Sequence, residues 1–259
     1  MISEKLRPVL KRLDALLSPP RCLCCGESLQ PATQFGTSAE ASPLLCGSCY
    51  RALPVIREPI CEQCGKPLIS EERFCLNCRA ITDSALSGIR GLFSYREEAI
   101  PLIHGLKERG DHRVAEFLAA EVLRRRLLPA ATSLIVPIPS SRRGRRRRGF
   151  DQALLFAGAL SRLSGVPACS IIVRRGGTEQ KSLDREGRLA NMTGKLGFRP
   201  GVDGKLRRRN LRSPGDAAPA SPILLVDDVS TTGATLEAAA RLFTSRGVET
   251  ITGLVIAID

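Results

Sequence analysis

The placement of the cysteines constrains the fold of this chain more than any other feature. Nine of the ten cysteines lie before residue 79, and eight of them form four Cys-x-x-Cys pairs. Two residues between thiolates allow one tight turn to aim both sulfurs at a single metal ion, and two such pairs complete a tetrahedral zinc site. The pairs are Cys22/Cys25, Cys46/Cys49, Cys61/Cys64 and Cys75/Cys78. The spacing therefore predicts two zinc ribbons.

The spacing leaves other arrangements open. One zinc ion with spare thiols would also use paired cysteines, as would disulfides, although a reducing compartment disfavours disulfides. Sequential sharing would assign the first two pairs to one ion and the last two to the second, and interleaved sharing is a further option. Cys24 lies inside the first pair and is predicted to be a bystander. No histidine or carboxylate stands where a catalytic fourth ligand would, so we expect structural sites that supply folding energy.

Hydropathy patterning divides the chain into three regions. A leucine stripe predicts an amphipathic helix at 1–20, the double zinc ribbon occupies 21–82, and strands alternate with helices over 83–259. Continuous apolar strands between helices favour a mostly parallel sheet flanked by helices, an α/β fold. The predicted strands are at 89–95, 134–139, 170–173, 223–228 and 250–258, and the predicted helices at 98–109, 113–127, 150–163 and 233–245. The Pro-, Gly- and Arg-rich stretch at 200–222 is predicted to be a mobile excursion.

The predicted strand at 223–228 leads into the most informative motif of the sequence. It ends in Asp227 and Asp228, and a hydroxyl-rich turn follows before the next helix. Backbone amides and hydroxyls at a helix N-terminus favour a phosphate, whereas paired carboxylates beside it suit the hydroxyls of a ribose or a metal. The turn and the helix start comprise Ser230, Thr231, Thr232, Gly233, Ala234 and Thr235. A helix cap on an ordinary strand–turn–helix is the alternative interpretation.

Six arginines in seven residues follow the predicted strand at 134–139. Such a run is typical of a nucleic-acid patch, a solvated tail or a diphosphate clamp. Its position between two ordered elements argues against a tail. If the strands are parallel, the run reaches the same sheet edge as Asp227 and Asp228, which predicts a polyphosphate groove.

The stretch at 223–236 resembles the phosphoribosyl diphosphate (PRPP) motif of type I phosphoribosyltransferases. The cysteine pairs, the segment Val-Pro-Ile-Pro…Arg-Gly-Phe-Asp-Gln at 136–152 and the stretch at 178–191 extend this resemblance to the ComF family, from about Cys22 to the C-terminus. The resemblance implies a type I phosphoribosyltransferase-like domain preceded by a double zinc ribbon. The excursion at 200–222 looks longer and more basic than is usual in the family.

The resemblance also implies roles for individual residues. Asp227 and Asp228 would contact the ribose of Mg²⁺-bound PRPP as the candidate catalytic residues, and residues 230–235 would wrap its 5′-phosphate. The basic loop that meets the diphosphate would use Ser140, Arg142, Arg143 and Arg148, and a lid would use Gln180, Arg188 and Asn191.

Three hypotheses follow for the function. The chain is a phosphoribosyltransferase, a non-catalytic protein that binds single-stranded DNA, or a nucleotide-sensing adaptor whose ribbons dock a helicase-like partner; the family implies a link to DNA uptake. Aromatic residues make up only 4% of the chain, so any DNA binding should be mostly electrostatic. No apolar stretch approaches the length of a membrane span and no signal-peptide run is present, so we expect a cytoplasmic protein without membrane insertion.

The net charge of +13 is unevenly distributed. Residues 83–259 hold 29 of the 39 basic and 18 of the 26 acidic side chains, so +11 belongs to this region and +2 to residues 1–82. Two zinc ions bound by eight thiolates would bring the ribbon region to about −2. The sequence thus predicts a mildly acidic zinc module beside a strongly basic phosphate-binding domain.

Overall fold

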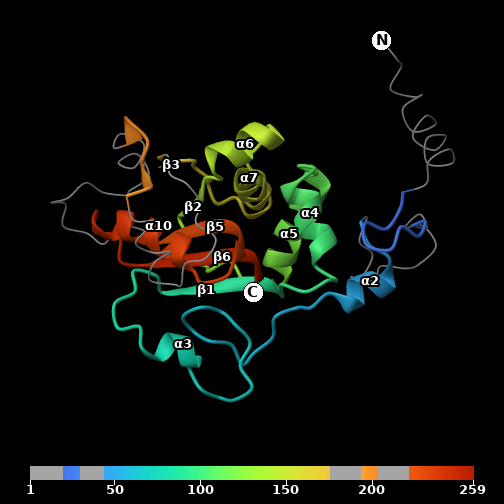
Figure 1. The fold of residues 1–259 in the computed structure, drawn as a ribbon, viewed down its shortest axis with the longest axis horizontal. Helices are drawn as coiled ribbons and strands as arrows, with labels where there is room; N and C mark the ends of the chain where they lie inside the picture. The colour runs from blue at the N-terminus through green and yellow to red at the C-terminus, as the bar shows by residue number, and fades with distance from the viewer. Residues whose placement is uncertain (1–19, 30–43, 176–193, 203–221) are drawn as a thin grey trace, which may run out of the picture.

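The computed structural model describes residues 20–29, 44–175, 194–202 and 222–259 (Figure 1). The helices are α2 (Gly47–Ala52), α3 (Leu76–Arg79), α4 (Ile100–Lys107), α5 (His112–Arg124), α6 (Arg142–Arg148), α7 (Gln152–Ser164) and α10 (Ala234–Thr244). The strands are β1 (Gly88–Ser94), β2 (Leu134–Pro137), β3 (Ile172–Arg174), β4 (Leu196–Phe198), β5 (Ile223–Ser230) and β6 (Ile251–Ile258). The predicted lid residues Gln180, Arg188 and Asn191, nearly all of the predicted helix at 1–20 and most of 200–222 lie outside the described residues.

A four-stranded sheet in the order β1-β6-β5-β2 forms the centre of the fold, and every neighbouring pair is parallel. The register sets Val136 beside Leu225, and Leu225 beside Gly253. Because the strands are parallel, the ends of β2 and β5 lie at one edge of the sheet. The predicted α/β class with a mostly parallel sheet is confirmed.

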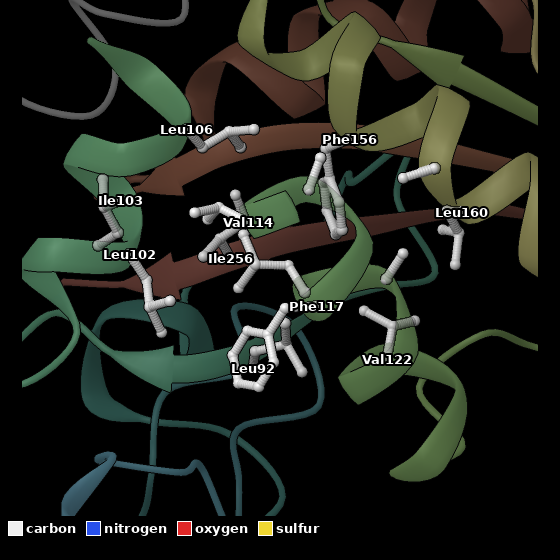
Figure 2. Packing of buried hydrophobic residues seen from close by; sticks show 14 of the residues in the cluster. Leu92, Leu102, Ile103, Leu106, Val114, Phe117, Val122, Phe156, Leu160 and Ile256 are labelled. Carbon is white, nitrogen blue, oxygen red and sulfur yellow. The ribbon is translucent and has the colours of Figure 1, made fainter. Parts of the chain in front are cut away.

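Alternate residues of the strands pack on opposite faces of this sheet. Leu224 and Val226 of β5 join a core with α4, α5 and α7, whereas Ile223 and Leu225 join a core with α10 and the antiparallel pair β3–β4. Figure 2 shows the first core, in which side chains of the three helices meet Leu92 of β1 and Ile256 of β6. Both faces are therefore covered, as continuous apolar strands require.

Two segments differ from the sequence prediction. The arginine run forms the helix α6 rather than a loop, because Ser141 Oγ accepts a hydrogen bond from the amide of Gly144 at 3.1 Å and Gly149 ends the helix at a φ of 80°. The strand β3 pairs antiparallel with β4 and stands apart from the main sheet.

A buried glutamate attaches the first cysteine module, the part of the chain that carries Cys22, Cys25, Cys46 and Cys49, to the α/β domain. Glu121 of α5 is 5% exposed, and its Oε1 accepts a hydrogen bond of 2.9 Å from the hydroxyl of Tyr50 in α2. Burial opposes ionisation of Glu121, but hydrogen bonds from Arg124 and Tyr50 hold its pKa below the usual value. A buried carboxylate needs this many partners to remain charged.

A second buried glutamate attaches the second cysteine module, the part of the chain that carries Cys61, Cys64, Cys75 and Cys78. Glu237 of α10 is 4% exposed and accepts hydrogen bonds from the Ser84 hydroxyl at 2.8 Å and the Ala85 amide at 3.0 Å. The backbone of this module also joins β1, since the amide of Ile89 donates to the carbonyl of Gln63 at 3.0 Å. Figure 1 shows α3 beyond edge strand β1, on the side away from α7.

Candidate functional site

The two aspartates that the sequence singled out lie within the last residues of β5. The Asp228 amide donates to Oδ1 of Asp227 at 2.9 Å, and the Val229 amide donates to Oδ1 of Asp228 at 2.8 Å. The chain then turns through Gly233, whose φ of 74° a residue with a side chain adopts only with strain, and enters α10. The turn places the N-terminus of an eleven-residue helix directly after the paired carboxylates.

Burial and the neighbouring carboxylate change the acidity of one of these groups. Burial raises the pKa of Asp227 well above its ordinary value, and the negative charge of Asp228 adds to the effect. A ligand that offers hydroxyl donors or positive charge to this pair would relieve the cost of ionising it.

Residues after β2 approach Asp228 through Gln152, the first residue of α7. Gln152 is 5% exposed, and its Nε2 donates to Oδ2 of Asp228 at 3.1 Å. Its Oε1 accepts hydrogen bonds from Nη2 of Arg148 at 2.9 Å and from the Ser140 hydroxyl at 2.7 Å. Asp151 also holds Ser140 in place, since its Oδ2 accepts a hydrogen bond of 3.0 Å from the Ser140 amide. The arginine helix and the acidic strand end are therefore joined by a continuous hydrogen-bond network.

These elements enclose a pocket of about 790 Å³, within the range of small-molecule sites. Its charged lining has five cationic side chains and three carboxylates: Lys107, Arg143, Arg147, Arg148, Arg174, Glu108, Asp227 and Asp228. The formal excess of two positive charges favours an anion. Two of the carboxylates are paired with cations of the same lining, Asp228 with Lys107 and Glu108 with Arg147. We call this cavity the phosphate pocket, after the class of anion that its charge favours.

The predicted site residues divide between this pocket and its surroundings. Asp227, Asp228, Thr235, Ser140, Arg143 and Arg148 line it together. Thr231 and Thr232 line a different cavity, and neither cavity is lined by Ser230, Gly233, Ala234 or Arg142. Ser230 is buried, and its carbonyl accepts the amide of Asp259 at 3.0 Å.

Sequence reasoning missed the contribution of α4. Lys107 lies 3.7 Å from Oδ2 of Asp228, and Glu108 pairs with Arg147 at 3.0 Å. Both are ordinary charged residues at a helix end, so no local signal marks them. Gln152 was visible as the end of the segment at 136–152, but its bond to Asp228 depends on tertiary structure.

The eight paired cysteines form two clusters with sequential sharing. Cys22, Cys25, Cys46 and Cys49 have their sulfurs within 4.8 Å of one another, as do Cys61, Cys64, Cys75 and Cys78, and Cys24 belongs to neither cluster. The Cys25–Cys46 and Cys64–Cys75 sulfurs are 3.7 and 3.8 Å apart. A tetrahedron with Zn–S bonds of about 2.3 Å has edges of roughly 3.8 Å, so both clusters fit zinc.

Hydrogen bonds from backbone amides lower the pKa of one cysteine in each cluster. Burial raises the pKa of Cys22, but hydrogen bonds from the backbone amides of Cys25 and Cys46 outweigh this effect and lower the pKa to about 6. At Cys61, burial is likewise outweighed by hydrogen bonds from the amides of Cys64 and Cys75, and the pKa falls to about 7. Burial and the neighbouring thiolates raise the pKa of Cys24 to about 11, and burial raises the pKa of the cluster member Cys78 to about 11 as well.

No helix of the described ranges is long and apolar enough to cross a bilayer.

Comparisons with known proteins agree with this architecture. Residues 13–79 match the double zinc ribbon domain family. The chain is 29% identical over 210 residues to competence protein ComFC of Bacillus subtilis, covering 78% of this chain and 79% of that protein. It is 28% identical over 243 residues to competence protein F of Haemophilus influenzae, covering 89% and 93%. The resemblance to the ComF family is thereby confirmed.

Among solved structures, the chain is similar to adenine phosphoribosyltransferase from Thermoanaerobacter pseudethanolicus. The sequence identity is 16% and the TM-score 0.33, and the match covers 59% of this chain and 84% of that one.

Proposed function

We propose that this ComF-like protein binds PRPP with Mg²⁺ in the phosphate pocket and acts as a phosphoribosyltransferase in DNA uptake or nucleotide metabolism. The observation that carries the proposal is the convergence of two chemistries in one cavity. Arg143 and Arg148 enter from the element after β2, and Asp227 and Asp228 enter from the end of β5. A ligand that carries both a diphosphate and a ribose diol matches this division.

Each part of the ligand would meet its own group of residues. The Asp227 and Asp228 carboxylates would accept hydrogen bonds from the ribose hydroxyls. Amides at the start of α10, with the hydroxyl of Thr235, would hold the 5′-phosphate at the positive end of the helix. Arg143 and Arg148 would bind the diphosphate, because guanidinium groups match phosphate oxygens bidentately.

Magnesium fits the donor set of the pocket. Mg²⁺ is usually held by one or two carboxylates together with phosphate oxygens of the substrate, and Asp227 and Asp228 provide such carboxylates. When bound, it would neutralise charge on the diphosphate. The protein's own part in transfer is positioning: the ribose is fixed by the aspartates while the arginines and Lys107 stabilise the negative charge that gathers on the departing diphosphate.

A screen for PRPP-dependent release of diphosphate across nucleobases and other amine acceptors tests this activity. We expect one acceptor class to support release in wild-type protein and release to fall at least 100-fold in an Asp228→Asn variant. Release that is the same in the variant would contradict the proposal. A catalytically silent protein that still binds PRPP would restrict the proposal to a sensing role.

The outward side of α6 favours single-stranded DNA binding as a second function. Arg142 and Arg146 are exposed and do not line the phosphate pocket. Arg143 and Arg147, each the next residue along the helix, do line it. A phosphate backbone bound along this helix would be recognised by charge, without base specificity. Docking of a helicase-like partner through the zinc ribbons is the other non-catalytic function within this proposal.

A further inference from the structure

The turn that leads from β5 into α10 has two supports, one from the helix and one from edge strand β1. Glu237 lies in the first turn of α10, and its backbone amide donates to the carbonyl of Gly233 at 2.9 Å. Ile89 of β1 is 3% exposed and packs against the same glycine, because a Cβ atom on Gly233 would lie 2.9 Å from Cδ1 of Ile89. Both supports are in turn attached to the second cysteine module.

The side chain of Glu237 makes the first attachment. Its Oε2 accepts a hydrogen bond of 2.8 Å from the hydroxyl of Ser84, and its Oε1 accepts one of 3.0 Å from the amide of Ala85. Ser84 in turn accepts a 2.7 Å hydrogen bond from Nε2 of Gln63, which lies inside the third Cys-x-x-Cys pair. Two consecutive hydrogen bonds therefore lead from a metal-binding turn of the module to α10.

Burial makes these hydrogen bonds energetically important. Glu237 is 4% exposed, and Arg241, one turn further along α10, donates to its Oε1 from Nε at 3.0 Å. A buried carboxylate that loses a partner is no longer compensated for its desolvation. Displacement of Ser84 would remove the hydrogen bond to Oε2 and favour movement of the first turn of α10.

Ile89 makes the second attachment. Its amide donates to the carbonyl of Gln63 at 3.0 Å, and a Cβ atom on Gly65 would clash with its carbonyl oxygen, so the metal-binding turn lies directly on β1. The side chain of Ile89 meets Gly233. The module thus fixes the backbone of Ile89, and the side chain of Ile89 supports the turn into α10.

The first cysteine module is attached at a different place. Tyr50 donates to Glu121 near the C-terminal end of α5, and no residue of α5 lines the phosphate pocket. The two modules therefore differ in what they can hold in position. Only the second one contacts the elements that support the turn into α10 among the contacts described above.

We propose that Glu237 is a positioning residue for the turn between β5 and α10. Through Gln63 and Ser84, the second cysteine module holds this turn in the conformation that receives a 5′-phosphate. The binding of a phosphate at the turn rests on the proposed function, whereas the positioning of the turn does not. Amides that are already held in place bind an anion at a lower cost in conformational entropy.

Hydrogen exchange of the full-length, zinc-loaded protein measures the positioning without any ligand. We expect Glu237→Ala to accelerate exchange in peptides that cover residues 230–240 at least fivefold and to leave α7 unchanged. Glu237→Gln keeps an acceptor for the Ala85 amide and should stay within twofold of the wild type. Unchanged exchange at 230–240 in Glu237→Ala would overturn the proposal. Equal acceleration in α7 would also overturn it, because a loss of overall stability affects both regions.

Ser84→Ala is a milder variant and decides the question if Glu237→Ala does not fold. It removes the hydroxyl that links Gln63 to Glu237 and should accelerate exchange at 230–240 at least threefold. Ser70→Ala makes the same change at an exposed position of the same module and should have no effect. Equal exchange in the two serine variants would contradict the proposed connection.

Loss of zinc from one cluster at a time provides an independent contrast. Cys75→Ser disrupts the cluster of the second module, and Cys46→Ser disrupts the cluster of the first. We expect only Cys75→Ser to accelerate exchange at 230–240. The same exchange at 230–240 in both variants would show that the second module does not hold the turn.

Calorimetric titration of PRPP with Mg²⁺ into the same proteins tests the consequence for binding. Glu237→Ala and Ser84→Ala should weaken binding at least fivefold, whereas Glu237→Gln and Ser70→Ala should bind as the wild type does. If exchange responds as expected and the wild type does not bind PRPP, the proposed function is wrong and the positioning stands. If all these proteins bind PRPP equally, the role of the module in phosphate binding is wrong.

Discussion

Gln152 donates from Nε2 to Oδ2 of Asp228 at 3.1 Å, and this bond joins residues 76 positions apart in the chain. The amide oxygen of the same side chain, Oε1, accepts hydrogen bonds from Arg148 and Ser140. The arginine helix is therefore held in a fixed relation to the acidic strand end. This relation turns two separate sequence motifs into one pocket.

Replacing Gln152 with alanine should weaken PRPP binding about tenfold, equivalent to roughly 1.4 kcal/mol, because Asp228, Arg148 and Ser140 each lose a partner. Calorimetry with PRPP and Mg²⁺ measures the effect. Leu154→Ala on the same helix is the control, since Leu154 is 46% exposed and does not line the pocket. An unchanged affinity in Gln152→Ala would show that the network has no role in positioning.

The two sides of α6 should have separable functions. Arg143→Ala/Arg147→Ala removes two charges from the phosphate pocket, and Arg142→Ala/Arg146→Ala removes two from the outer surface. The first pair should weaken PRPP binding more than tenfold. The second pair should spare PRPP and reduce the slope of log affinity for single-stranded DNA against log salt by about 1.4, from roughly 0.7 per phosphate contact.

Fluorescence anisotropy with a labelled oligonucleotide across a salt series provides the slope. Equal effects of both double variants on both ligands would mean that α6 acts only as a diffuse positive charge. A flat slope in the wild type would remove the DNA hypothesis.

The raised pKa of Asp227 predicts a pH-dependent difference in stability. A carboxyl whose pKa is higher in the folded state than in the unfolded chain loses stability as pH rises from about 4 towards the folded-state pKa. Asp227→Asn cannot ionise and escapes this loss. The Tm of Asp227→Asn minus that of the wild type should therefore increase between pH 5 and pH 8. A difference that stays constant or decreases would contradict burial as the dominant effect on Asp227.

The cysteine clusters predict the zinc stoichiometry of single variants. Wild-type protein should contain two zinc ions per chain, and Cys46→Ser or Cys75→Ser should reduce the content to one, because each disrupts a different cluster. Cys24→Ser should retain two. Mass spectrometry of metals after dialysis measures the content. Loss of zinc from Cys24→Ser, or retention of two in Cys46→Ser, would mean that the ligand sets are wrong.

The zinc clusters and the aspartate loop could be predicted from sequence because each rests on short spacing. Two residues between cysteines fix a turn, and the apolar run before Asp227 fixes a strand, so local chemistry was enough in both places. The sequence also carried cap signals for α6 in Ser141 and Gly149, but the density of arginines favoured a loop interpretation instead.

Contacts between distant segments could not be predicted in this way. Lys107 reaches Asp228 only because α4 packs over the sheet, and Glu121 and Glu237 are buried only because the cysteine modules cover them. In the sequence these residues look like solvent-exposed charges on helices. Their partners become evident only when the parallel sheet brings the elements together.

The most direct test of the central claim is a calorimetric titration of PRPP with Mg²⁺ into wild-type protein and into Asp227→Asn/Asp228→Asn. Ile69→Arg, an exposed substitution outside the phosphate pocket, provides the control. The account predicts one site per chain in the wild type and the control, and at least a 30-fold loss of affinity, roughly 2 kcal/mol, in the double variant. Equal affinity in all three proteins would contradict it.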